Sequence, residues 1–100
     1  MRHHDLVMDL EKRIKATNNY HHVKRNWEYT NHNRILGELD VKAKRVNSVR
    51  SVYFEIKGNY NETSYLKAIN QFKRCKHTFP ETNWVFVYVS PELTKRVYIK

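Results

Sequence analysis

Apolar and polar residues alternate along several segments of the chain, which is the pattern expected of half-buried strands. Segments 35–44 and 49–57 follow this pattern, 23–29 is a further strand candidate, and turn-forming residues at 30–33 and 46–48 separate the three. We therefore expect three strands, of which the second and third pair antiparallel. The apolar face of the second strand falls on odd positions: Ile35, Leu39, Val41 and Ala43.

Apolar residues with the spacing of an α-helix occur before and after these strands. Residues 5–15 carry apolar side chains about one turn apart, with Asp5 as a plausible N-cap. A second helix is expected to begin after Asn61 or Thr63 and to end near His77, since Pro80 cannot continue a helix. Its apolar stripe consists of Tyr65, Ala68, Ile69, Phe72 and Cys75.

Two more strands complete the pattern. Residues 84–89 are a continuous apolar run, typical of a central strand that is covered on both faces, and 97–99 are a short last strand. The order is helix, three strands, helix, two strands. This order predicts an α/β fold with a mixed central sheet flanked by helices, and the 100 residues form a single domain.

The chain is strongly basic, which narrows the choice of partner. Its 19 Lys and Arg against 10 Asp and Glu give a net charge of +9, which indicates a polyanionic partner. We expect a nucleic acid rather than a membrane, because the longest apolar run has only the length of a strand. The single cysteine, Cys75, fits a reducing intracellular compartment, and the charged first residues do not have the pattern of a secretory signal.

Three charged residues fall on one face of the predicted hairpin between 35–44 and 49–57. Parity places Asp40 beside Glu55 and Lys57, with Glu38 as a neighbour of Asp40. Two carboxylates are what a hard cation such as Mg²⁺ requires, and an ammonium beside them can hold a water or stabilise charge on a phosphate. The pattern predicts a site for phosphoryl chemistry.

These residues resemble the motif of the PD-(D/E)xK nuclease superfamily, which includes restriction endonucleases, archaeal Holliday-junction resolvases and small VRR-NUC domains. The sequence "GELD" ends at Asp40 and is followed by Glu55-Ile56-Lys57, and Leu39 stands where the superfamily has proline. The resemblance covers about residues 5–90. It implies a restriction-endonuclease-like αβββαβ core, which agrees with the element order read from the pattern.

The resemblance also implies roles for individual residues. Asp40, Glu55 and the backbone carbonyl of Ile56 would bind Mg²⁺ or Mn²⁺, and Lys57 would orient or help to deprotonate the attacking water. Glu11 would complete the metal site, and Gln71 matches a glutamine that some members carry on the second helix. The implied activity is metal-dependent hydrolysis of DNA phosphodiester bonds, with branched or junction DNA as a substrate by analogy.

Basic residues near the hairpin and on the second helix are candidates for binding the DNA backbone. Because one small domain offers little surface and cutting both strands needs two sites, we expect a homodimer without a small-molecule cofactor. The richness in Asn, Lys and Tyr is typical of an AT-rich genome, and a viral source is one explanation. The candidate DNA-binding residues are Lys42, Lys44, Arg45, Arg50, Lys73 and Arg74.

Each of these features also has a purely structural explanation. Glu55 and Lys57 could form a surface ion pair, and Asp40 could be an exposed residue that favours solubility. Glu11 could lie on the solvent-exposed face of a helix, and Gln71 could serve only in packing. The six histidines lack the spacing of structural zinc sites. Tryptophan and tyrosine side chains could stack on bases or pack the sheet. Two other functions therefore stay open: a non-catalytic nucleic-acid-binding module, and a partner-binding protein whose charge serves solubility.

Overall fold

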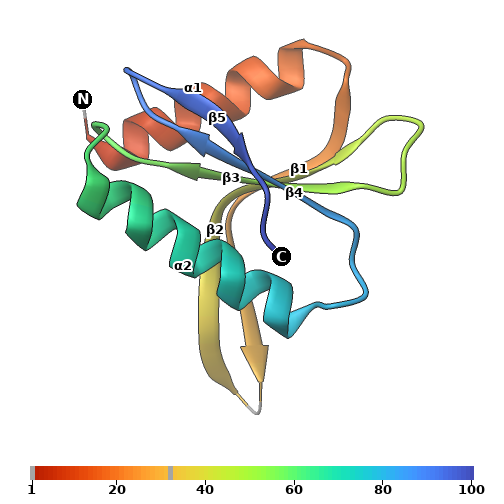
Figure 1. Cartoon of the computed structure of the whole chain (residues 1–100). Coiled ribbons are helices and arrows are strands. Elements are labelled where there is room, and N and C mark those ends of the chain that lie inside the picture. Colours follow the sequence, from red (N-terminus) through yellow and green to blue (C-terminus); the bar gives the residue numbers. More distant parts are fainter. Residues whose placement is uncertain (1, 32) are drawn as a thin grey trace.

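The structure, a computed structural model, describes residues 2–31 and 33–100 and has the α/β architecture that the pattern predicts (Figure 1). A single mixed sheet has the strand order β1-β2-β3-β4-β5. β3 and β4 are parallel and are connected through α2, whereas the other neighbours are antiparallel. The elements are α1 (His3–Ala16), β1 (Tyr20–Asn31), β2 (Arg34–Arg45), β3 (Ser51–Ile56), α2 (Glu62–Thr78), β4 (Trp84–Val89) and β5 (Thr94–Val97).

The two helices cover opposite faces of the sheet, and each has its own hydrophobic core. The α1-side core consists of Val7, Leu10, Ile14, Val41, Ala43, Val52, Phe54, Ile56 and Val85. The α2-side core consists of Tyr29, Leu39, Tyr53, Ala68, Phe72, Cys75, Phe86, Tyr88 and Val97. β3 contributes to both cores, because all six of its residues are buried. This central position explains why β3 can hold polar side chains away from water.

The N-terminus of α1 differs from the sequence-based prediction. α1 begins at His3, with Arg2 at the N-cap position and no capping side chain, so the prediction of Asp5 as N-cap is wrong. Asp5 lies instead in the first turn, where a negative charge is favourable. The start of α2 is confirmed, since Asn61 accepts a hydrogen bond from the Ser64 N–H at 2.8 Å. The last strand ends at Val97 rather than beginning there.

β2 changes the face that it buries, which simple alternation did not predict. Leu39 packs in the α2-side core, whereas Val41 packs in the α1-side core. The neighbouring strand is irregular at the same level: Asn26, between the partners of these two residues, has a left-handed φ of 51°. The expectation that Leu39 shares a face with Val41 is therefore wrong. Asp40 lies at the point where the buried face changes.

The β1–β2 hairpin extends beyond the rest of the sheet (Figure 1). β3 pairs with β2 only from Val41 to Lys44, so the distal part of the hairpin has no third strand beside it. Ile35 on this distal part is 60% exposed, contrary to its predicted place on a buried face. Gly37 allows the hairpin to pack closely, since a Cβ there would come within 2.3 Å of the Tyr29 hydroxyl.

Candidate active site

Asp40 and Glu55 lie next to each other where the pairing of β2 and β3 ends. The last pair of this ladder is Val41 with Phe54, so the next residue on each strand is an acid. Instead of a regular strand contact, Oδ2 of Asp40 accepts a hydrogen bond from the Ile56 N–H at 2.9 Å. This contact fixes the carboxylate of Asp40 against the end of β3.

Glu55 is almost completely buried, with 2% of its surface exposed. The Tyr53 hydroxyl donates a hydrogen bond to Oε1 at 2.7 Å, and Nζ of Lys57 lies 3.4 Å from Oε2. Alternation along the strand places Tyr53 and Lys57 on the same side as Glu55, as the parity argument required. The structure thus brings Asp40, Glu55 and Lys57 to one place.

Asp40 and Glu55, called the acid pair below, form an electrostatic environment that favours the binding of a cation. Burial, together with the nearby charge of Asp40, raises the pKa of Glu55 to about 7. The hydrogen bond from Tyr53 and the charge of Lys57 act in the opposite direction but do not offset this effect. The Tyr53 hydroxyl stays a neutral donor, because burial and the Glu55 charge raise its pKa. Without a cation, Glu55 therefore holds a proton for much of the time at neutral pH.

His3, at the start of α1, is a member of this site that sequence reasoning missed. Its Nε2 lies 3.2 Å from Oδ2 of Asp40 and 3.0 Å from the Ile56 carbonyl oxygen. Because both partners are acceptors, Nε2 carries a proton in this arrangement. The search for zinc-type spacing did not find it, since its partners lie 37 and 53 residues further along the chain. No local pattern in the sequence carries that information.

Other predicted site residues make different contacts. Glu11 lies 3.8 Å from the ammonium of Lys15 and 3.8 Å from Arg25, and these ion pairs hold it along α1. The side-chain oxygen Oε1 of Gln71 is buried without a hydrogen-bond partner among the described residues. Glu38 is exposed on β2 opposite Glu28. None of the hydrogen bonds and ion pairs found in the described part of the chain joins Glu11, Gln71 or Glu38 to the acid pair.

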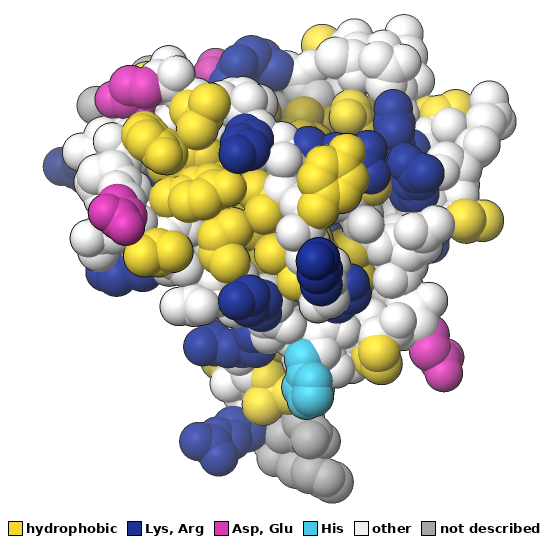
Figure 2. All heavy atoms as spheres, viewed as in Figure 1, with side chains coloured by type: hydrophobic (Ala, Val, Ile, Leu, Met, Phe, Trp, Pro, Cys, Tyr) yellow, Lys and Arg dark blue, Asp and Glu magenta, His cyan; other side chains and the backbone are white. Residues whose placement is uncertain are grey.

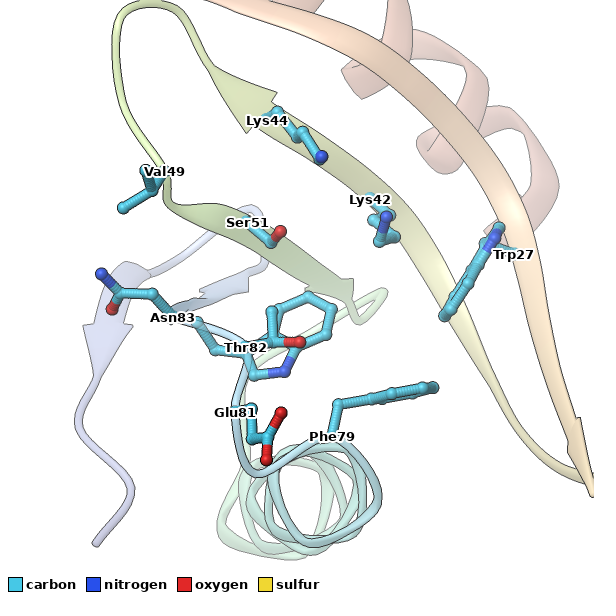
Figure 3. Close-up of a pocket in the computed structure, with 10 residues that line it drawn as sticks. Trp27, Lys42, Lys44, Val49, Ser51, Phe79, Glu81, Thr82 and Asn83 are labelled. Atoms are coloured by element: carbon cyan, nitrogen blue, oxygen red, sulfur yellow. The ribbon is translucent and has the colours of Figure 1, made fainter.

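The candidate DNA-binding residues fall into three groups. Lys42 and Lys44 line a cavity on the α2 side of β2 (Figure 3). Arg45 and Arg50 come together at the β2–β3 turn, where the Arg45 N–H donates to the Arg50 carbonyl at 3.2 Å. The third group, Lys73 and Arg74, is exposed on α2. In the view of Figure 2, Lys and Arg side chains surround an apolar patch, and acidic side chains lie toward the margins.

Asp40 and the Ile56 carbonyl are the groups of this site that could hold a divalent cation. Within residues 2–31 and 33–100, no three His, Cys, Asp or Glu side chains form a group that could hold a metal ion. A donor set must therefore include the Ile56 carbonyl and water, which suits Mg²⁺ because it keeps several waters in most protein sites. The oxygens of Asp40 and Ile56 share one neighbour, Nε2 of His3, at 3.0–3.2 Å. Neighbouring ligands of an octahedral ion with bonds of about 2.1 Å are spaced by about 3 Å.

Comparison with known proteins does not assign the chain to a family. No protein-family model matches it, and searches of curated proteins and of solved structures find no similar chain. No helix in the described part of the chain is long and apolar enough to cross a membrane. Function is therefore argued from the site itself.

Proposed function

We propose that the protein is a metal-dependent DNA endonuclease with a restriction-endonuclease-like αβββαβ core. One observation supports this more than any other: a buried acid, Glu55, is held between a lysine and a second carboxylate at the end of a central strand. A surface ion pair would not be buried, and acids are rarely buried this completely for packing alone. The net charge of +9 provides the attraction for a nucleic acid.

Asp40, Glu55 and the Ile56 carbonyl would hold Mg²⁺ or Mn²⁺. When bound, such an ion polarises a phosphoryl oxygen and lowers the pKa of a coordinated water. Asp40 is already oriented by the Ile56 N–H, so little reorganisation is needed on binding. Tyr53 holds one oxygen of Glu55, which leaves the other oxygen facing Lys57.

Lys57 would act on the water and on the phosphate. Its ammonium lies 3.4 Å from Glu55 and is about one fifth exposed, so it can reach a phosphate at the surface without leaving the site. There it positions the attacking water and stabilises the negative charge that builds on the phosphate oxygens. The bond formed is from the water oxygen to phosphorus, and the bond broken is from phosphorus to one ester oxygen of the DNA strand.

Nicking of supercoiled DNA in Mg²⁺ tests this proposal. We expect the wild type to nick the plasmid and Lys57→Ala to do so about 100-fold more slowly, because one charged donor to the transition state is lost. Lys12→Ala, which removes an exposed lysine from α1, should be unchanged. If the wild type binds DNA in a salt-dependent way but never nicks it, the non-catalytic binding module is the better description. If no salt-dependent binding occurs, the charge serves only solubility.

His3 is proposed as a further ligand, in the place for which the sequence suggested Glu11. Its Nε2 contacts the same two oxygens that would bind the ion, and it would bind the ion only after giving up the proton that it shares with them, as the neutral tautomer with N–H at Nδ1. We expect His3→Ala to raise the Mg²⁺ concentration for half-maximal nicking by about 10-fold or more. His4→Ala, at the exposed neighbouring position, is the matched control. A lower Mg²⁺ requirement in His3→Ala would show instead that His3 competes with the ion.

Cleavage of both strands would require two copies of the site, and we therefore propose that the protein acts as a homodimer. Each chain has 100 residues and presents one acid pair. Branched or junction DNA is proposed as substrate by analogy with other small nucleases of the superfamily.

A further inference from the structure

A cavity of about 450 Å³ opens beside the β1–β2 hairpin (Figure 3), on the α2 side of the sheet. Its walls come from β1, β2, the start of β3 and the segment that follows α2. The volume is in the range of sites that bind small organic groups. Both tryptophans of the chain, Trp27 and Trp84, line it. The proposed catalytic residues do not line this cavity.

Aromatic rings form one wall of this cavity. Trp27 and Phe79 have ring centroids 5.9 Å apart, and Phe79 and Trp84 follow at 6.3 Å, with the planes of each pair tilted. All three side chains are only half-buried. A half-buried aromatic surface beside a strand of basic residues is the combination that binds unpaired nucleobases.

Lysines form the opposite wall. Nζ of Lys42 lies 4.8 Å from the centre of the Trp27 ring, and Lys44 projects from the same strand toward the cavity (Figure 3). The like charges of Lys44 and Lys24 act on Lys42 as well. A phosphate placed here would relieve that repulsion. A base that stacks on Trp27 would replace the ammonium on the ring and release Lys42 toward the phosphate, since stacking is the stronger contact.

Glu81 is the single carboxylate among the lining residues, and its side chain points into the cavity (Figure 3). A carboxylate repels phosphate but accepts hydrogen bonds from the amino groups of bases. The charges of the cavity are therefore divided: ammonium groups lie along β2, and an acceptor lies near the aromatic rings. This division fits a nucleotide better than a free phosphate or an inorganic anion.

We infer that this cavity binds one unpaired nucleotide of the DNA substrate, with its base on Trp27 and its phosphate at Lys42 and Lys44. The inference rests on the proposed nuclease function and specifies its substrate class. Lys42 lies two residues from Asp40 along β2, which corresponds to about 7 Å. The cavity includes Ser51 at the start of β3, whereas Glu55 lies near the end of β3, so the bound nucleotide would lie further along the DNA strand from the phosphate that is cleaved rather than next to it. The preferred substrates are strands with unpaired bases, such as single-stranded ends and branch points.

Tryptophan fluorescence provides a direct test, because both tryptophans of the chain line the cavity. The 100-residue protein is titrated in EDTA with a ten-nucleotide oligothymidylate and, separately, with a blunt duplex of the same length. We expect saturable quenching by the single strand. Trp27→Leu should weaken single-strand binding about 5- to 150-fold, as expected for the loss of one stacked base. Its effect on duplex binding should be less than about twofold.

Two variants make the result specific. Trp27→Tyr keeps a stacking ring and should retain most of the affinity, whereas Tyr98→Leu removes a 78% exposed aromatic residue outside the cavity and should change nothing. The inference is overturned if Trp27→Leu and Tyr98→Leu weaken binding equally, if Trp27→Tyr binds no better than Trp27→Leu, or if single-strand and duplex binding fall together. Because EDTA prevents cleavage, these results are independent of whether the protein proves to be a nuclease.

Discussion

Asp40→Asn should abolish metal-dependent nicking, with a loss of about 1000-fold or more. Asparagine keeps the shape of the side chain, and its oxygen can still accept the hydrogen bond from the Ile56 N–H, so the end of β3 stays in place. What is lost is the negative charge that would hold the divalent cation. A factor of 1000 corresponds to about 4 kcal/mol, which is in the range that a metal ion contributes to stabilising charge in the transition state.

The measurement is the rate of conversion of supercoiled to nicked plasmid under excess protein. Asp9→Asn is the matched control, because Asp9 is an exposed acid on α1 that pairs with Arg13 at 3.2 Å. Circular dichroism spectra of both variants should match that of the wild type. Retention of more than a tenth of the wild-type rate by Asp40→Asn, with its fold intact, would exclude Asp40 as an essential ligand.

Glu55→Gln should raise the stability of the metal-free protein above neutral pH by as much as about 3 kcal/mol. The folded protein holds a proton on Glu55 up to a pKa of about 7, whereas the unfolded chain releases it near the ordinary value of 4.5. Between these values the folded state binds more protons than the unfolded state, so stability falls as the pH rises. The loss is complete above pH 7, and glutamine, which does not ionise, avoids it.

Urea unfolding in EDTA at several pH values between 4 and 8 measures this difference. Asp40, Tyr53, Lys57 and His3 also lie at the site, so the decisive quantity is the wild type minus the variant at each pH. That difference should be small near pH 4 and grow toward pH 8. Glu38→Gln, at an exposed position on β2, should follow the wild type. A difference that stays constant with pH would mean that folding does not shift the pKa of Glu55.

Mg²⁺ should act on the two proteins differently. In the wild type at pH 8, a cation that binds the acid pair stabilises only the folded state and raises the melting temperature. Glu55→Gln lacks one of the two charges and should show a smaller rise. The functional residues of the site would then lower the stability of the metal-free protein. An equal rise in both proteins would place the Mg²⁺ elsewhere.

The order and type of the elements could be predicted from the sequence because each depends on local periodicity. Alternation identified β2 and β3, the helical stripe identified α2, and the apolar run at 84–89 identified β4 within its observed bounds, whereas only the middle of β1 was predicted, as a strand candidate at 23–29. Parity also placed Asp40 beside Glu55 and Lys57, since neighbouring strands joined by a short turn have few possible registers. The order of the elements and the meeting of these three side chains therefore follow from the amino-acid sequence alone.

Three features were decided only by the tertiary structure. His3 reaches Asp40 because α1 packs across the sheet, a contact between residues far apart in the chain. Leu39 and Val41 are buried on opposite faces at the level of Asn26 on β1, which has a left-handed φ of 51°, and alternation within one strand contains no information about its partner. The aromatic cavity joins Trp27 of β1 to Phe79 after α2. Local periodicity fixes which face of an element is apolar, but the packing of several elements together decides which distant side chains meet.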